Sequence, residues 1–179
     1  ETGVSTGFKR CGSITVALTE ERKEEIFRQA AMARAFGVDV EEISPAEVKA
    51  KYEHLNIEGV TGGVWLPLDG QGDPANISLA LAKGARQMGA QVIERTKAMG
   101  VTRNGRRITS VQWENEQGDS GSIDCENVIN CGGMWGHEVG RMLGVNVPLH
   151  ACEHFYIVTE AIAGLTQMPV LRVPDECAY

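Results

Sequence analysis

The 179-residue sequence lacks long apolar runs and blocks of basic residues. No apolar stretch approaches the roughly 20 residues that span a bilayer, and the N-terminus lacks the basic-then-apolar pattern of a signal peptide. A formal net charge of −7 without a Lys/Arg-rich block argues against nucleic acid and anionic membrane surfaces as partners. With 42% apolar residues, the chain is typical of a globular protein, and its ligand is expected to be a small molecule.

Several motifs of catalysis and disulfide chemistry are also missing. There is no G-x-S-x-G elbow, no H-E-x-x-H and no P-loop, which excludes several hydrolase and kinase classes. The five cysteines are odd in number and form no C-x-x-C pair. This usage favours the reduced thiols of a cytosolic or mitochondrial-matrix protein over a disulfide framework.

One segment imitates a dinucleotide fingerprint. Residues 70–75 match G-x-G-x-x-A and precede a predicted helix, as the fingerprint requires. However, Pro74 offers no N–H to a phosphate, and the carboxylate of Asp73 would occupy the helix end that binds the pyrophosphate. We therefore predict a tight turn with an Asp N-cap and proline at the first helical position. No complete dinucleotide half-domain is visible.

Apolar periodicity, caps and turn residues predict the remaining elements. Helices are expected over residues 20–36, 45–51 and 74–88, the last with a buried face of Ile77, Leu81, Gly84, Ala85 and Met88. The second of these helices is expected to begin with a capping box of Ser44 and Glu47. Strands are expected over residues 12–18, 60–66, 91–96 and 155–159, the last in a long extended stretch over 147–160. Meander strands are expected at 101–102, 108–114 and 121–124, with turns at 104–105 and 117–119.

The most informative segment is residues 125–136, which reads as a buried strand that turns through Gly132 and Gly133 into a helix. The apolar stripe of that helix is formed by Trp135, Val139, Met142 and Leu143. A Gly-Gly turn brings bare backbone close to whatever lies above it, and the helix N-terminus points its amides there. Such a turn is typical of sites for phosphates or flat cofactors.

These elements predict two lobes that are interleaved in the sequence. The helix, meander and Gly-Gly turn over residues 73–144 form one block, and strand-bearing residues flank it on both sides. Because the sequence begins without Met, we expect it to be a piece of a longer protein.

His150, Cys152 and His154 would share one face of an extended strand. A zinc site is one interpretation, but no further Cys or His supplies a fourth ligand at a familiar spacing. The other two interpretations are a strand face that lines a polar cavity and a plain buried strand whose histidines are hydrogen-bonded. We assign no metal ligand.

Three segments together resemble the FAD-dependent amine oxidoreductases of the D-amino-acid-oxidase superfamily, and within it the sarcosine and dimethylglycine dehydrogenases. They are residues 72–86, 128–144 and 148–160, and the second and third are the more specific. The resemblance implies an α+β fold, in which an FAD-binding lobe is interrupted by a substrate lobe built on a large, mainly antiparallel sheet. Residues 1–70 and 146–179 would be two parts of the substrate lobe, and residues 71–145 would be the later part of the FAD-binding lobe.

The resemblance also implies roles for single residues. Ala98 would meet the adenine, and Gly132, Gly133 and Trp135 would lie along the flavin and pyrophosphate. His154 and Tyr179 would lie beside the substrate amine as the catalytic pair. These two residues and the four cofactor residues are the candidate site.

The reaction implied is hydride transfer from an N-methyl carbon to FAD, with the one-carbon unit released or passed to a folate. The family's strand–GxGxxG–helix and its flavin-linking histidine are absent from these residues. We therefore expect the chain by itself to bind FAD weakly or not at all and to be inactive. The alternatives are a relative that oxidises another amine, an amino acid or glycerol phosphate, and a non-catalytic ligand- or metal-binding module.

Overall fold

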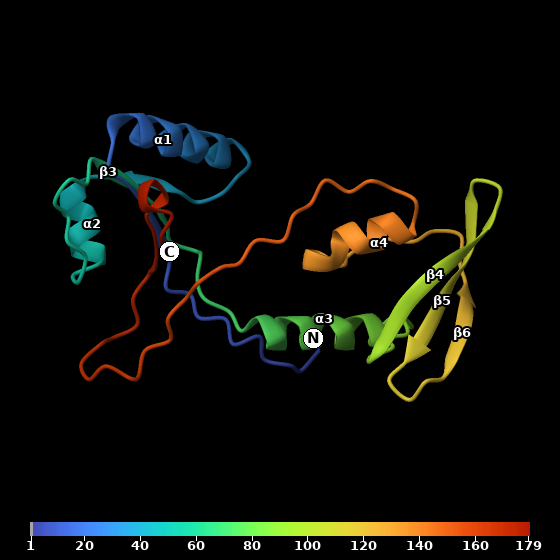
Figure 1. The fold of residues 1–179 in the computed structure, drawn as a ribbon. Coiled ribbons are helices and arrows are strands. Elements are labelled where there is room, and N and C mark those ends of the chain that lie inside the picture. Colours follow the sequence, from blue (N-terminus) through green and yellow to red (C-terminus); the bar gives the residue numbers. More distant parts are fainter. Residues whose placement is uncertain (1) are drawn as a thin grey trace. The chain divides into compact units, whose positions relative to one another are not determined.

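The computed structural model describes residues 2–179, which form two units (Figure 1). The first consists of residues 2–90 together with 161–179, and the second of residues 91–160. Each has its own sheet, so each is described by itself.

The first unit is built on a four-stranded sheet with the order β2-β3-β1-β7. The pairs β2–β3 and β3–β1 are antiparallel, and β7 lies parallel to β1. Its strands are β2 (Glu41–Ile43), β3 (Gly62–Leu66), β1 (Ser13–Ala17) and β7 (Val170–Arg172). The last 19 residues therefore fold back onto the first strand.

Local capping accounts for the helices of this unit. Thr19 caps α1 (Glu20–Ala35) by accepting a hydrogen bond from the amide of Arg22. Ser44 and Glu47 form the capping box that was predicted for α2 (Pro45–Lys51). Each of the two side chains accepts a hydrogen bond from the backbone amide of the other residue. The third helix of the unit is α3 (Pro74–Gln87), and a short 3-10 turn, η2 (Pro174–Glu176), follows β7.

Both faces of the sheet are covered. On one face, Ala17 and Val64 of the sheet pack against Ile26 and Ala30 of α1. On the other, Ile14 and Val16 pack with Ile43 and with Val48 of α2. Because burial of apolar side chains is the main favourable term in folding, these two clusters are the core of the first unit.

The second unit is an antiparallel meander followed by a helix. Its elements are β4 (Thr96–Asn104), β5 (Arg107–Asn115), β6 (Ser120–Asp124), the 3-10 turn η1 (Gly133–Trp135) and α4 (Gly136–Met142). Gly105 and Gly118 have positive φ in the two hairpin turns, as the turn sequences predicted. A guanidinium N–H of Arg103 in β4 donates to the carbonyl of Leu143 at the end of α4, which ties the helix to the meander.

Two predicted strands, at residues 91–96 and 125–131, are wrong. Strand β4 begins only at Thr96, which lies opposite Asn115. The ladder of β6 ends near Cys125, whose amide donates to Thr109, and Ile129 beyond it is 84% exposed. A strand needs neighbours to receive its backbone hydrogen bonds. Residues 91–95 precede the first pair of the β4–β5 ladder, and residues 126–131 lie beyond the β5–β6 ladder.

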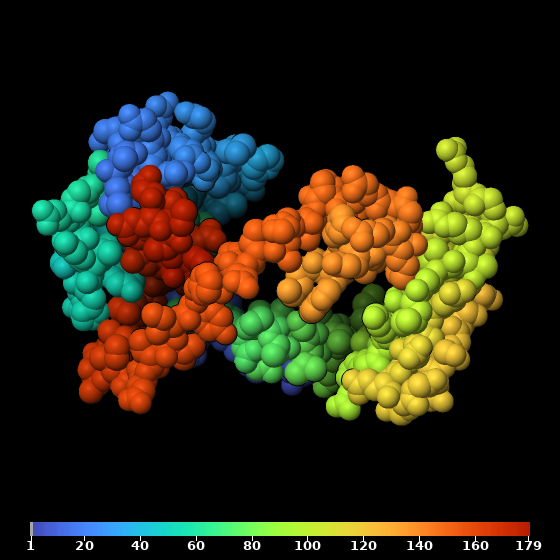
Figure 2. All heavy atoms as spheres, in the orientation of Figure 1, coloured from blue at the N-terminus to red at the C-terminus, as the bar shows by residue number. Residues whose placement is uncertain are grey.

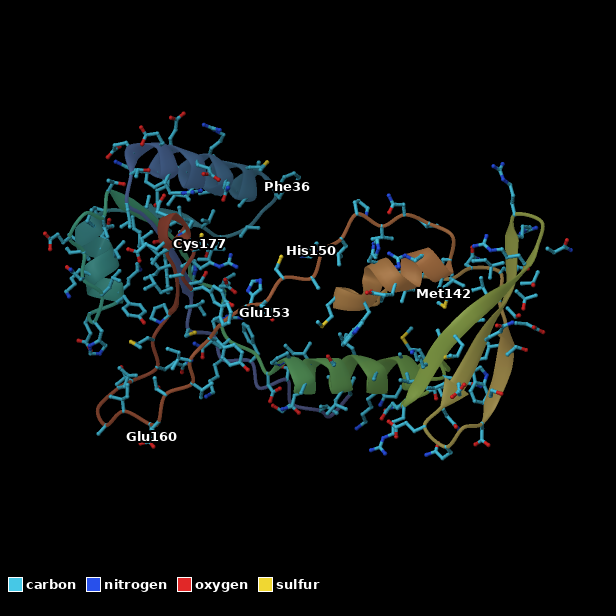
Figure 3. The ribbon with its side chains drawn as sticks, viewed as in Figure 1. Phe36, Met142, His150, Glu153, Glu160 and Cys177 are labelled. Atoms are coloured by element: carbon cyan, nitrogen blue, oxygen red, sulfur yellow. The ribbon has the colours of Figure 1, made fainter. Side chains whose placement is uncertain are left out.

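The strand expected at residues 155–159 is also wrong. No regular element occurs between residues 145 and 160, and Figure 3 shows His150, Glu153 and Glu160 along an irregular path. Phe155 and Ile157 are 87% and 90% exposed. The residue types favour a strand, but no other strand of the described chain pairs with them.

The buried helix faces were overestimated. In α3 only Ala80 is buried, whereas Leu81 and Met88 of the expected face are 71% and 90% exposed. Of the stripe predicted for α4, Leu143 is buried, but Trp135 is 64% exposed and lies in η1. Both apolar faces lack a covering layer in the described chain, which periodicity alone could not reveal.

The predicted class is confirmed, because the structure is an α+β arrangement with mainly antiparallel sheets. The assignment of residues 1–70, 71–145 and 146–179 to substrate and cofactor lobes stays a prediction. All five cysteines are free thiols. Among residues 2–179, no helix is both long enough and apolar enough to cross a bilayer.

Candidate functional site

Tyr179 follows a tight turn at the end of the first unit. The turn closes with an antiparallel bridge between Val173 and Ala178, whose backbone groups exchange hydrogen bonds of 2.8 and 3.2 Å. Cys177 has a φ of +53°, in the left-handed region that non-glycine residues seldom adopt. Tyr179 is 74% exposed and is one of the residues that line two cavities.

The larger cavity, of about 750 Å³, mixes polar and apolar walls. Tyr52 and Tyr179 line it, together with Leu171 of β7 and Val173, which follows β7. Lys9 lies at its edge and is bridged through its backbone to Gln71, with hydrogen bonds of 2.7 and 3.0 Å. This volume is in the range of small-molecule sites.

The smaller cavity, of about 390 Å³, lies between α1 and the turn. Arg22 and Gln29 line it from α1, and Arg172 and Tyr179 line it from the C-terminal segment. Figure 2 shows this C-terminal segment in red packed against the blue residues near the N-terminus of α1.

Asp175 anchors the turn to the N-terminal end of α1. Its Oδ2 accepts a hydrogen bond of 2.9 Å from the amide of Leu18, and its Oδ1 accepts one of 3.1 Å from Nε of Arg22. The Leu18 amide, and then the Arg22 guanidinium, hold the pKa of the Asp175 carboxyl below its ordinary value. In return the pKa of Arg22 is raised, chiefly by its hydrogen bond to Asp175.

The Gly132-Gly133 turn is held by a residue that the sequence analysis did not single out. Oδ1 of Asn130 accepts a 3.0 Å hydrogen bond from the amide of Gly132, and its Nδ2 donates a 2.8 Å bond to the carbonyl of Gly136. The signal was present, since asparagine readily bonds the backbone two residues on. Asn130 thereby shapes the predicted cofactor turn.

The two glycines differ in their surroundings. A Cβ on Gly132 would lie 3.1 Å from both Asn130 and Val139, so this glycine permits close packing on α4. Gly133 has a φ of +53°, and a Cβ there would meet nothing within 4 Å. The turn therefore presents open backbone on one side, next to the exposed ring of Trp135.

Ala98 lies on β4 opposite Trp113, beside a register irregularity between Ala98 and Gly100. It is exposed, like Gly133 and Trp135, and all three belong to the second unit. The contact of Ala98 with an adenine stays a prediction, as do the cofactor contacts of the three residues near the turn.

His154 is exposed in the irregular stretch of the second unit, whereas Tyr179 belongs to the first. Their pairing beside a substrate amine stays a prediction. His150 and Cys152 do not share a strand face with His154, because that strand is not formed. Within the described residues 2–179, no group of three His, Cys, Asp or Glu side chains is suited to hold a metal ion.

His137, in the first turn of α4, links this helix to the chain that follows it. Its Nδ1 lies 2.8 Å from the carbonyl oxygen of Val147, and its Nε2 lies 2.8 Å from a guanidinium nitrogen of Arg141. A neutral ring with the proton on Nδ1 satisfies both contacts. The histidine helps to fix the start of the stretch that leads to His154.

Residues 70–75 confirm the interpretation as a capped helix start. Oδ1 of Asp73 accepts hydrogen bonds of 2.9 and 3.1 Å from the amides of Ala75 and Asn76, and Pro74 is the first residue of α3. The amides that a phosphate would use are therefore bound by the protein's own carboxylate.

The sequence of this chain matches a known protein family. The family model described as "DAO: FAD dependent oxidoreductase" matches residues 1–179. The chain is 38% identical to the mouse protein "Sarcosine dehydrogenase, mitochondrial" over all of its own length and 20% of that protein. It is 32% identical to rat "Dimethylglycine dehydrogenase, mitochondrial", covering 96% of this chain and 20% of that protein.

A third relative is named as a regulatory subunit and not as a dehydrogenase. The chain is 36% identical to mouse "Pyruvate dehydrogenase phosphatase regulatory subunit, mitochondrial", over 89% of this chain and 18% of that protein. Among solved structures, L-proline dehydrogenase from P. horikoshii matches with a TM-score of 0.68 and 28% identity, over 80% of this chain and 37% of that one. The chain thus spans about one fifth of the length of the curated relatives it matches.

Proposed function

We propose that this chain, which belongs to the DAO family of FAD-dependent oxidoreductases, is part of a flavoprotein that oxidises an N-methylated amine such as sarcosine or dimethylglycine. The observation that carries the proposal is the similarity along the whole chain to sarcosine dehydrogenase at 38% identity. Both dehydrogenase relatives are named as mitochondrial. This favours the mitochondrial matrix over the cytoplasm as the location of the flavoprotein.

The Gly132-Gly133 turn fits a flat cofactor. Its backbone is open above Gly133, where a side chain would otherwise project, and Asn130 holds the turn in shape. In our proposal Gly132, Gly133 and Trp135 hold the flavin and pyrophosphate part of FAD, and Ala98 contacts the adenine. When bound, FAD supplies an acceptor for the hydride of a substrate C–H bond.

His154 and Tyr179 act on the substrate amine in this proposal. A protonated amine has no lone pair to assist the loss of hydride from its N-methyl carbon, so the site must favour the neutral form. An imidazole nitrogen accepts the amine proton, and the phenol of Tyr179 orients the nitrogen. Loss of the hydride leaves an iminium. Water hydrolyses this iminium, or a folate takes its one-carbon unit.

The experiment that tests this proposal is anaerobic reduction of the full-length flavoprotein by sarcosine, dimethylglycine or glycerol 3-phosphate, each in a separate assay. The loss of flavin absorbance measures the reduction. Because positioned acid–base groups contribute roughly 10²–10⁴-fold to rates, His154→Ala should slow reduction by about 100-fold. His150→Ala, four residues earlier in the same exposed stretch, is the control and should stay within twofold. An unchanged rate for His154→Ala would remove His154 from the site.

FAD binding by the isolated chain tests whether these residues form the whole cofactor site or only a part of it. Its candidate flavin contacts lie in one exposed turn and one exposed strand, and its single fingerprint-like segment is capped by Asp73. We therefore propose that the 179-residue chain binds FAD weakly or not at all. Stoichiometric flavin absorbance in the purified chain would contradict this.

A second candidate function is a non-catalytic, regulatory role. The specific observation in its favour is the 36% identity to a protein named as a phosphatase regulatory subunit. The same reduction assay separates the two candidates. Reduction of bound flavin by an amine supports the oxidoreductase, whereas flavin that no amine, amino acid or glycerol phosphate reduces supports the regulatory role.

A further inference from the structure

The segment that carries Tyr179 leaves the sheet before it reaches that residue. The parallel ladder of β7 on β1 ends where Arg172 lies opposite Thr15. Val173 still packs beside the second core cluster, but the rest of the turn lies beyond the strand pairing. Contacts outside the ladder must therefore hold the turn that leads to Tyr179.

Asp175 provides those contacts at the middle of the turn. Its side chain is only 16% exposed, and both of its oxygens receive hydrogen bonds from residues more than 150 positions earlier in the chain. Leu18 and Arg22 lie on either side of the N-cap of α1, where the helix dipole favours a negative charge. The carboxylate is thus complementary to its site in charge as well as in hydrogen bonding.

The turn is stiff enough to transmit this anchoring. The bridge between Val173 and Ala178 closes it, and amides of Glu176 and Cys177 bond back to the carbonyls of Val173 and Pro174, at 3.0 and 3.2 Å. Tyr179 comes directly after the closing bridge. A shift of the turn at Asp175 therefore moves the tyrosine with it.

We propose that Asp175 is a positioning residue, which sets the place of Tyr179 at the substrate amine by holding the 173–178 turn against the N-terminal end of α1. The inference rests on the proposed function, in which Tyr179 touches the substrate. Asp175 itself acts only through the turn.

The place of Tyr179 can be measured without any reaction. The chain contains three tyrosines, so uniform labelling with 3-fluorotyrosine gives three fluorine resonances, which single Tyr→Phe variants assign. Asp175→Ala should move the Tyr179 resonance toward its position in the urea-unfolded chain and leave that of Tyr52 in place. Glu176→Gln, the matched control in the same turn, should leave both unchanged.

The effect on catalysis is measured in the full-length flavoprotein. A displacement of about 1 Å in a catalytic group can cost roughly 100-fold in rate, so we expect Asp175→Ala to slow flavin reduction by roughly 10- to 100-fold. KM should change less than kcat. Asp175→Asn keeps an acceptor for the Leu18 amide and should recover part of the rate. Glu176→Gln should stay within twofold.

A double-mutant cycle separates positioning from general destabilisation. If Asp175 acts through Tyr179, then Asp175→Ala slows the Tyr179→Phe enzyme much less than it slows the wild type. Equal slowing in both backgrounds overturns the inference, as does an unmoved Tyr179 resonance in Asp175→Ala. If Tyr179→Phe leaves reduction unchanged, the proposed role of Tyr179 fails, and the inference for catalysis fails with it. The resonance still tells whether Asp175 holds the tyrosine.

Discussion

Truncation of Ile14 is a direct test of where the core of the first unit lies. Ile14 is fully buried in the second core cluster and lies between Trp65 and Leu171 of the neighbouring strands. Ile14→Ala removes three carbons, worth about 2.4 kcal/mol at roughly 0.8 kcal/mol each. The cavity left behind adds to this, and we expect a total loss of about 3–4 kcal/mol in the free energy of unfolding.

Urea unfolding followed by tryptophan fluorescence measures this loss. The three tryptophans include Trp113 and Trp135 in the second unit, and replacing both by Phe leaves Trp65, in the strand beside Ile14, as the reporter. At a slope of about 1.5 kcal/mol per M, the midpoint should fall by about 2–2.7 M.

Two further variants make the test specific. Ile14→Val removes one carbon and should cost about 1 kcal/mol. Leu81→Ala truncates an apolar residue of α3 that is 71% exposed and should change stability by less than about 0.5 kcal/mol. If Ile14→Ala cost no more than Leu81→Ala, the assignment of the core around Ile14 would be refuted.

Three other predictions concern the local contacts. Because folding lowers the pKa of Asp175, the ionised carboxylate stabilises the folded state at neutral pH, and this stabilisation is lost as the pH falls below about 4. The difference in urea midpoint between wild type and Asp175→Asn should therefore shrink steadily from about pH 6 to about pH 2. Ser44→Ala removes the capping box of α2 and should cost about 1 kcal/mol, measured from the same unfolding curves. Gly70→Ala would place a Cβ 2.1 Å from the carbonyl oxygen of Lys9, so it should destabilise by about 1–3 kcal/mol and raise hydrogen exchange at the bridge between Lys9 and Gln71; normal exchange there would show that the backbone contact is not formed.

The features predicted correctly from the sequence share a short range. The capping box of Ser44 and Glu47, the N-cap of Asp73 and the turn at Gly105 each involve residues within four positions of one another. Their hydrogen bonds form inside one segment, so the residue types suffice to predict them. The same holds for the meander, whose strands are neighbours along the chain.

The wrong predictions share a dependence on distant partners. Residues 155–159 have the composition of a strand but lack a paired neighbour in the described chain, and an unpaired segment cannot satisfy its backbone as a strand does. Likewise, the apolar side of α3 has the right period for burial, yet Leu81 and Met88 are exposed. Periodicity reports what a segment could bury, and only packing decides whether a surface is there to cover it.

For the candidate site, the sequence alone determined the Gly132-Gly133 turn, the false fingerprint at Asp73 and the family to which the chain belongs. Only the tertiary structure showed that Asp175 meets Leu18, 157 positions away, and thereby anchors the turn before Tyr179. The physical reason is that a carboxylate at the end of a chain carries no local sign of which amide it will bind. Its partner is chosen by the parallel pairing of β7 with β1, which brings the two ends of the first unit together.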